Sequence, residues 1–260
     1  MYFDYFELLS GEPIPVEGIG SFRSPFVREL YPQTGIGHDA YSLYVSFLCW
    51  NEEEFYKYGE LAKLRGIDRL KATKGLTLYD AITLLKPTRE MCAEIFSFFM
   101  LETLVWDEND RKYVAILTDD DGQHVSGEIN RDNFEKVRSM MLQLNYVNLD
   151  KDSTVAHPTS KRSEEMWNKV QNFLKEQNSK EVNDPKEEYK IGNIVSKVCS
   201  IHPSYNFTNI GNLTVFQLYD AFFQIGYMRS IALSERIFSN HGGDTFNFND
   251  WLKPILKTHK

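Results

Sequence analysis

Residues 101–129 read LETLVWDENDRKYVAILTDDDGQHVSGEI and contain three short runs rich in β-branched and aromatic residues. These runs are Leu101–Trp106, Arg111–Leu117 and Gln123–Ile129. The acidic segments DEND and DDDG lie between them and have the composition of tight turns. Three strands joined by two short turns predict a small antiparallel β-meander.

On both sides of this segment the hydrophobic residues follow the period of an α-helix. Between His38 and Trp50, for example, Tyr41, Tyr44, Val45 and Leu48 recur at the spacing of one helix face. The same reading predicts further helices at Ser24–Leu30, Glu52–Leu64, Thr77–Leu85, Thr88–Met100, Arg131–Leu144, Glu164–Glu176, Glu187–Cys199, Leu213–Ile225 and Ile231–Phe238. The predicted fold is therefore mostly α (class α+β), with one three-stranded meander. The remainder of residues 1–37 is predicted to be irregular.

Residues with capping chemistry precede several of these helices. Thr77 and Asp80 match the capping box, in which the two side chains bond each other's backbone N–H groups. Thr214 and Gln217 repeat the pattern before the helix near the C-terminus. Ser24 stands directly before a proline and is the predicted N-cap of its own short helix.

A polar segment divides the chain. Residues 148–162 carry a proline and several serines and threonines, and they are the best candidate for a linker. The sequence therefore predicts an N-terminal α+β domain over residues 1–147 and a C-terminal helical domain over residues 163–260. The two can pack together as one body.

Composition and charge exclude some classes of partner. Of the 260 residues, 42% are hydrophobic and 25% are charged, which is typical of a folded globular protein. The formal net charge is -8, and the basic residues form no strong cluster. Because nucleic acid is polyanionic, we do not expect it to be a partner.

The thiols and the apolar runs indicate where the protein acts. The three cysteines, Cys49, Cys92 and Cys199, form no CxxC pair, and an odd, sparse set is typical of reduced thiols inside a cell. The N-terminal residues lack the basic and apolar regions of a signal peptide. The longest apolar run, near Ile95–Met100, is too short to cross a membrane, so we expect no membrane partner.

The sequence contains no recognisable catalytic or metal-ligating pattern. Asp107–Asp110 and Asp119–Asp121 are clusters of carboxylates. Asp119, Asp121, Gln123 and Glu128 partly resemble a calcium loop, but the turns of a meander explain the acidic residues better. His241 is followed by two glycines, which is typical of a helix end. The pairs Gly18–Gly20 and Gly35–Gly37 do not continue into a nucleotide-binding motif. We therefore expect no enzymatic activity, no cofactor and no metal site, with an enzyme whose site leaves no local motif as the alternative.

The helix predicted at Leu213–Ile225 is apolar on nearly every side. Such a helix lies either in the centre of a core or against a partner protein. The candidate partner-binding residues are its large aromatic side chains, Phe216, Tyr219, Phe222 and Phe223. Packing within the protein's own core is the alternative for this helix.

Motifs at the two ends of the chain resemble those of proteins from tailed phages and prophages of Gram-positive bacteria. At the N-terminus, Leu8–Val16, Gly18–Gly20 and Ser24–Leu30 fit the pattern "sG.pi.v.giG....P.lrEi". At the C-terminus the resemblance lies in Cys199–Ser204, Asn209–Ile210, Leu213–Asp220 and Asp250–Ile255. It covers about a third of the chain and leaves out the meander.

Proteins with these motifs look like assembly chaperones of the phage tail or baseplate. The resemblance implies a non-enzymatic protein of the host cytoplasm that binds a tail or baseplate protein, with the tape-measure protein as one candidate. It is also compatible with a homo-oligomer. The shared motifs are structural and imply no active-site residues in this chain. Two other classes stay open: a structural subunit that remains in the virion, and an enzyme without a recognisable local motif.

Overall fold

The computed structural model describes residues 2–51, 75–120, 122–147, 190–241 and 247. The chain divides into two compact units. Unit 1 comprises Met1–Leu149 together with Asn212–Phe216, and unit 2 comprises Asp150–Gly211 and Gln217–Lys260. The predicted linker at residues 148–162 and the helices predicted at Glu52–Leu64 and Glu164–Glu176 lie outside the described residues.

The described residues form a mixed α+β fold with seven α-helices and two small antiparallel sheets. The α-helices are α1 (Tyr5–Ser10), α2 (His38–Cys49), α5 (Leu78–Thr83), α6 (Lys86–Phe98), α7 (Phe134–Leu144), α9 (Ile191–Ile201) and α10 (Val215–His241). The strands are β1 (Ile14–Val16), β2 (Gly20–Phe22), β3 (Thr103–Asp107), β4 (Lys112–Asp119) and β5 (Gly122–Ile129). Two 3-10 helices, η1 (Val27–Leu30) and η4 (Ile210–Asn212), complete them.

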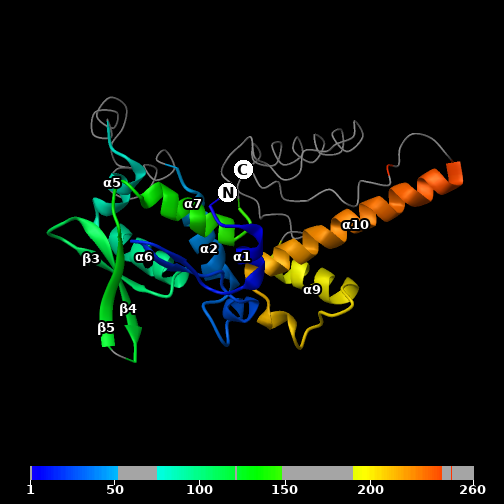
Figure 1. Ribbon diagram of the computed structural model, residues 1–260, viewed down its shortest axis with the longest axis horizontal. Coiled ribbons are helices and arrows are strands. Elements are labelled where there is room, and N and C mark those ends of the chain that lie inside the picture. Colours follow the sequence, from blue (N-terminus) through cyan, green and yellow to red (C-terminus); the bar gives the residue numbers. More distant parts are fainter. Residues whose placement is uncertain (1, 52–74, 121, 148–189, 242–246, 248–260) are drawn as a thin grey trace. The chain divides into compact units, whose positions relative to one another are not determined.

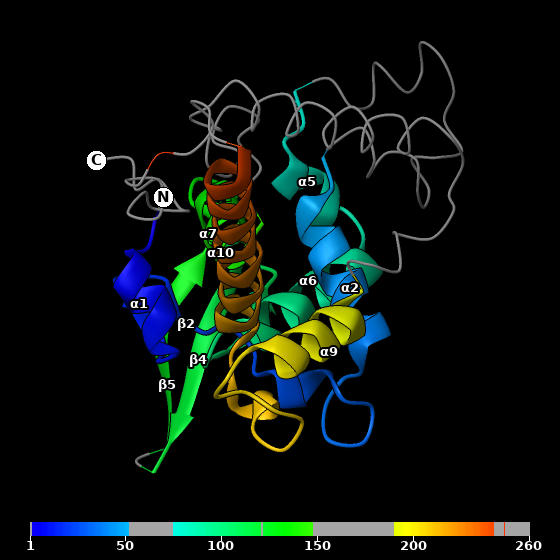
Figure 2. The same ribbon diagram turned by 90° about the vertical axis from the view of Figure 1, so that its right-hand side faces the viewer.

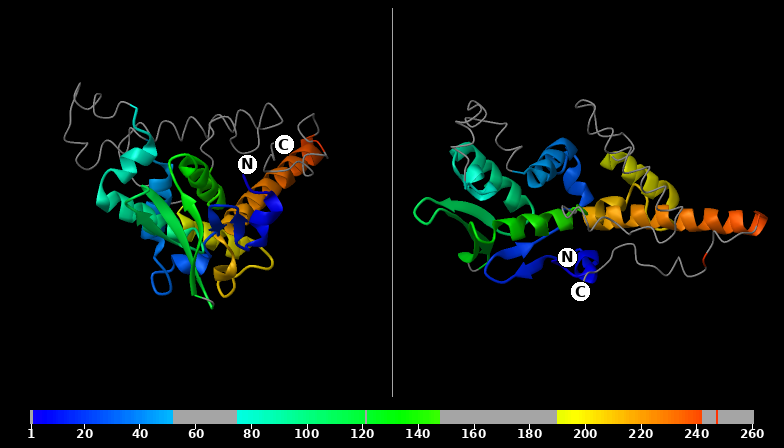
Figure 3. Two further views of the ribbon diagram at one scale, coloured as in Figure 1. Left: turned by 60° about the vertical axis from the view of Figure 1, so that its left-hand side comes forward. Right: turned by 90° about the horizontal axis from the view of Figure 1, so that it is seen from above.

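The predicted meander is confirmed. Strands β3, β4 and β5 pair antiparallel in sequence order, with Trp106 opposite Tyr113 and Ile116 opposite Val125. The pairing shifts between Ala115 and Ile116, which marks a β-bulge. Figures 1 and 2 and the left view of Figure 3 show β4 and β5 reaching beyond α6 and α7.

One face of the meander supplies the core of unit 1. Alternate residues Leu104, Tyr113, Ala115 and Ile129 are buried, as the two-residue period of a strand requires. Rings from the neighbouring helices are buried with them. Phe96 of α6 stacks on Phe134 of α7 with ring centroids 5.4 Å apart, and Tyr79 of α5 packs edge-on against Phe134 at 5.3 Å. Aromatic pairs of this kind add packing energy beyond the buried area alone.

The prediction of an irregular segment before residue 38 is wrong for two parts of it. Asp4 and Glu7 form a capping box that starts helix α1. Two acidic residues three positions apart are a sequence signal of a helix start, so the sequence does indicate this helix. Strands β1 and β2 form a two-stranded sheet despite Pro15. Gly18 and Gly20 have φ angles of 71° and 137°, which L side chains rarely adopt, so glycine suits both positions of this turn.

A buried carboxylate joins strand β2 to the start of the meander. Both side-chain oxygens of Glu102 accept the N–H of Ser21, at 2.9 and 3.0 Å, and the residue is 2% exposed. The backbone bonds Leu101 N–H to Ser21 O (3.0 Å) and Arg23 N–H to Phe99 O (2.9 Å) lie beside it. This carboxylate is hydrogen-bonded, as a buried ionisable group must be, and its role here is structural.

Residues 24–28 pair with residues 212–216, and we call this pairing the terminal clamp. The Val27 N–H donates to Leu213 O and the Val215 N–H donates to Pro25 O, both at 2.8 Å. The Arg28 guanidinium donates to the Asn212 side chain at 2.9 Å. Residues nearly 190 positions apart in the sequence are therefore joined within unit 1.

The prediction that Ser24 is the N-cap of its own short helix is wrong. Its side chain instead supports the start of α10. The segment after it forms only the 3-10 helix η1, with Phe26 at the N-cap position. The Ser24 hydroxyl accepts the N–H of Phe216 at 3.2 Å and donates to Leu144 O at 3.0 Å. Because the first N–H groups of a helix lack an internal acceptor, this distant serine satisfies one of them.

Some of the other predicted helix boundaries agree with the structure and some do not. Helix α5 begins directly after Thr77, which forms the predicted capping box with Asp80. Helix α6 begins at Lys86, earlier than predicted, because a proline is tolerated in the first turn. The two helices predicted between Leu213 and Phe238 are one helix, α10, which continues through Gly226.

The terminal clamp predicts a measurable cost for the loss of one hydroxyl. Replacing Ser24 with alanine leaves Leu144 O and the first turn of α10 without their buried partner. We expect the free energy of unfolding to fall by about 1–3 kcal/mol. Urea denaturation followed by circular dichroism measures this change.

The matched control is Ser200→Ala. Ser200 is exposed and its hydroxyl bonds only Ser196 O, one turn back in α9, at 2.7 Å. Its replacement is expected to change stability by less than about 0.5 kcal/mol. Equal effects of the two substitutions would contradict the assigned role of Ser24.

Candidate partner-binding surface

Helix α10 carries the four aromatic residues predicted to bind a partner. One of them, Phe216, is buried, whereas the other three are half-buried. Phe216 is 1% exposed. Its ring packs against Tyr5 at 6.3 Å and against Tyr146 at 5.1 Å, both in unit 1. Phe216 is therefore a core residue of unit 1, and its assignment to a binding surface is wrong.

The other three residues, Tyr219, Phe222 and Phe223, belong to unit 2 and are half-buried. Phe222 and Phe223 pack edge-on, with ring centroids 5.6 Å apart. The Lys197 ammonium of α9 lies 5.8 Å from the centre of the Phe222 ring, within the range of a cation–π contact. Burial raises the pKa of the Tyr219 hydroxyl. These rings are partly covered yet keep accessible area.

The apolar character continues along the helix. Met228 is 51% exposed and Leu233 is 59% exposed. From Val198 to Met228 the sequence contains a single Asp, Glu, Lys or Arg, which is Asp220, and that residue is only 8% exposed. A quarter of the whole chain is charged, so this segment is depleted in charge in the way that the centre of a protein interface is.

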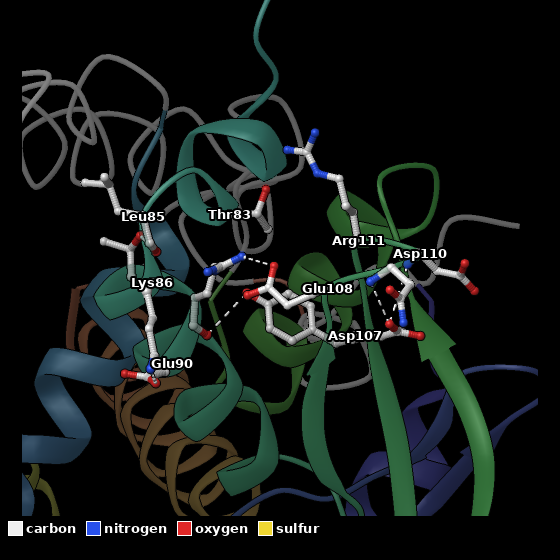
Figure 4. Close-up of polar contacts among 12 residues, drawn as sticks. Thr83, Leu85, Lys86, Glu90, Asp107, Glu108, Asp110 and Arg111 are labelled. Carbon is white, nitrogen blue, oxygen red and sulfur yellow. Dashed lines mark hydrogen bonds and ion pairs between the residues drawn. The ribbon is translucent and has the colours of Figure 1, made fainter.

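A second group of functional side chains lies in unit 1, where α6 meets the turn between β3 and β4 (Figure 4). The Arg89 guanidinium pairs with the Glu108 carboxylate at 2.9 Å and lies 5.1 Å from the centre of the Trp106 ring. The Trp106 indole and the Arg89 guanidinium beside it lower the pKa of Glu108. Figure 4 shows Glu108 turned toward the helix.

Side chains also bond to the backbone of this turn. The Asp107 carboxylate accepts the Asn109 N–H at 2.9 Å, as an aspartate commonly does in a turn. The Tyr79 hydroxyl donates to the carbonyl of Arg111 at 2.7 Å, and Arg111 has a left-handed φ of 51°. In the ranges that the structure describes, no three metal-ligating side chains converge. This cluster fixes the turn against the helices.

The one fully buried thiol, that of Cys92, is not expected to react as a nucleophile. Cys92 is 0% exposed, and burial raises its pKa to about 12. Its neighbour Tyr113 also has a raised pKa, again because burial disfavours the charged form. A thiol that stays protonated at neutral pH is not a nucleophile.

Cys92 is therefore expected to react with a thiol reagent only when the protein unfolds. Titration with a chromogenic disulfide at pH 8 should label the half-buried Cys49 and Cys199 in the native state, and peptide mass spectrometry should find Cys92 unmodified. In urea all three should react. Labelling of Cys92 as fast as Cys199 in native buffer would show that this core opens readily.

Comparison with known proteins gives one match. Residues 180–256 match the family model described as the YomV second domain. YomV is encoded by a Bacillus phage or prophage, so the match indicates a phage-related origin. No curated protein and no solved structure matches the chain. Among the described helices, none is both long and apolar enough to pass through a membrane.

The matched residues include α9 and the whole of α10. They also include residues 212–216 of the terminal clamp, which belong to unit 1. The three half-buried aromatic residues thus lie in the phage-related part of the chain. The prediction that they bind a partner stays a prediction.

Proposed function

We propose that this protein is a non-enzymatic assembly factor of a phage tail or baseplate. In this proposal it acts as a chaperone in the host cytoplasm. It binds a tail or baseplate protein through α10, with Tyr219, Phe222 and Phe223 as the contact residues. The tape-measure protein, a long helical chain, is the preferred partner because two helices can bury apolar stripes against each other.

One observation carries the proposal. Helix α10 presents the half-buried rings of Tyr219, Phe222 and Phe223 on a segment almost without charge, and the exposed side chain of Leu233 follows three turns beyond Phe222 on the same side of the helix. Apolar side chains that share one side of a helix and have little charge between them are typical of a protein-binding surface. The match of this segment to a phage-related domain supports the choice of a phage partner.

The test compares binding by the full-length chain and its variants to the purified tape-measure and baseplate proteins of the same phage genome. Replacing both Phe222 and Phe223 with alanine should weaken binding at least tenfold, because aromatic anchors dominate interface energies. Leu233→Lys, at a position 59% exposed and on the same side of the helix as Phe222, should weaken binding without any effect on folding.

Phe6→Ala is the matched control, since Phe6 is 78% exposed and lies in unit 1. It should bind as the wild type does. Calorimetry measures the affinities, and circular dichroism confirms that each variant is folded. Absence of binding to every tail and baseplate protein, or an equal loss in the Phe6 variant, would overturn the proposal.

Mass spectrometry of purified virions separates the proposed chaperone from a structural subunit. A chaperone should co-purify with its partner from prophage-induced cells and be absent from virions. Abundance in virions would instead identify a subunit of the tail or baseplate.

A further inference from the structure

The meander has a second, largely apolar face that points away from the core of unit 1. Tyr113 and Ala115 of β4 are buried on the core side, so the residues that alternate with them point outward. Cross-strand partners lie on the same face of a sheet, which assigns the residues of β3 and β5 as well. We call the outward residues of the three strands the outer face: Thr103, Val105, Val114, Ile116 and Val125.

An apolar outer face is unusual for an antiparallel sheet. Such a sheet generally alternates apolar residues toward the core with polar residues toward water. Strand β4 instead reads KYVAILTD, a nearly continuous apolar run of the kind found in strands that are buried on both faces. Val105 and Val125 are nevertheless 48% and 67% exposed. The sequence of β4 therefore fits a sheet that is covered on its outer face as well.

The β-bulge adds Val125 to the outer face. Gly127 pairs with Ala115 on the core side, and in a regular strand Val125, two residues away, would lie on that same side. The extra residue Ser126 shifts the pairing, and its hydroxyl donates to Ala115 O at 3.3 Å. Val125 consequently lies opposite Ile116. Bulges often redirect a side chain next to a functional site, and this one directs a valine into solvent.

Both ends of the outer face are acidic. Lys112 pairs with two carboxylates at one end, at 3.0 and 2.7 Å. The other basic residue of the meander, Arg111, extends toward α5 (Figure 4). The acidic residues are Asp107, Asp110 and Glu128 at the end where Lys112 lies, and Asp119 and Asp120 at the turn between β4 and β5. Carboxylates therefore outnumber ammonium groups around the apolar residues.

This charge arrangement selects the occupant of the face. Nucleic acids and anionic membranes are polyanionic and would be repelled. A second copy of this chain would place its own acidic ends against these ones in either orientation, because both ends carry the same charge. A protein segment that is apolar in its middle and has Lys or Arg at both ends is complementary to the face in both respects.

We propose that the outer face of the meander binds an amphipathic helix of a protein partner, with Lys or Arg residues near both ends of its apolar stripe. A helix is a common cover for the apolar face of a sheet. Strand β4 has 8 residues, which at about 3.3 Å each span about 26 Å. A helix of about 17 residues covers that length. The outer face lies in unit 1 and outside residues 180–256, so this proposal is independent of the one for α10.

The experiment places the photo-cross-linking residue benzoyl-phenylalanine at position 125 of the full-length chain, in cells that express it from its own genome. Position 124 is the matched control, because His124 is exposed but pairs with Leu117 and so lies on the other side of the same hairpin. We expect a cross-link from position 125, but not from position 124. Mass spectrometry should locate it in a segment of a distinct protein that is apolar with Lys or Arg at both ends.

A synthetic peptide of that segment is then titrated against the purified full-length chain. Val125→Ser should weaken binding about tenfold and Val105→Ser about threefold or more, whereas His124→Ser should leave it unchanged. The same peptide with Glu in place of its Lys and Arg residues should bind at least about tenfold more weakly, because the charges would then repel. Circular dichroism confirms that each variant is folded.

Several results would overturn the inference. They are a cross-link from position 125 to this chain itself or to a second copy, no cross-link specific to that position, a cross-linked segment without basic ends, and wild-type affinity for Val125→Ser. The two proposals fail separately, because they use different surfaces. If the α10 variants lose binding to a tail protein while position 125 gives no specific cross-link, the proposed function stands and this inference is wrong.

Discussion

The terminal clamp is the interaction on which the rest of the described structure depends. It joins the N-terminal segment around Pro25 to the segment around Leu213 through two backbone hydrogen bonds of 2.8 Å. Closing a loop of this length costs conformational entropy, which the buried residues on both sides must offset. Val27, Leu30, Val215 and Phe216 are all at most 3% exposed. The clamp therefore fixes where α10 begins and holds its first turn within unit 1.

That position decides what α10 can do. Its first turn is capped by Ser24 and buried through Phe216, so the start of the helix contributes to stability. The residues after Phe216 belong to unit 2; Leu218 and Asp220 are still buried, whereas Met228 and Leu233 are 51% and 59% exposed. One helix thus divides into an anchored end and an apolar accessible length. This division reconciles the two interpretations that the sequence left open, core packing and partner binding.

Local patterns in the sequence were sufficient for the meander and for the capped helices. Alternating residues and acidic turns between Leu101 and Ile129 identify three strands because a strand pair joined by a short turn needs only local information. Thr77 likewise identifies the start of α5. The β1–β2 sheet was missed because Pro15 and the flanking glycines resemble a loop, and its stability comes from Glu102, 81 residues away from Ser21.

The candidate site shows the same limit. The aromatic residues of α10 were identified from their density, but nothing local distinguishes Phe216 from Phe222. Burial of Phe216 comes from Tyr5 and Tyr146, which are distant in the sequence. The ordered loop at residues 202–210 was not predicted, because the bonds that fix it join side chains to backbone over two to five residues. Asparagine at positions 206 and 209 is the signal that could have indicated an ordered turn.

Amide hydrogen exchange tests the terminal clamp most directly. The first N–H groups of a helix have no internal acceptor and normally exchange early. In this protein the amides of Val215 and Phe216 are bonded by Pro25 and Ser24, so they and the Val27 amide should exchange as slowly as the strand amides of β4. Exchange as fast as that of Ile191 and Gly192, at the first turn of α9, would show that the two ends of the chain are not joined.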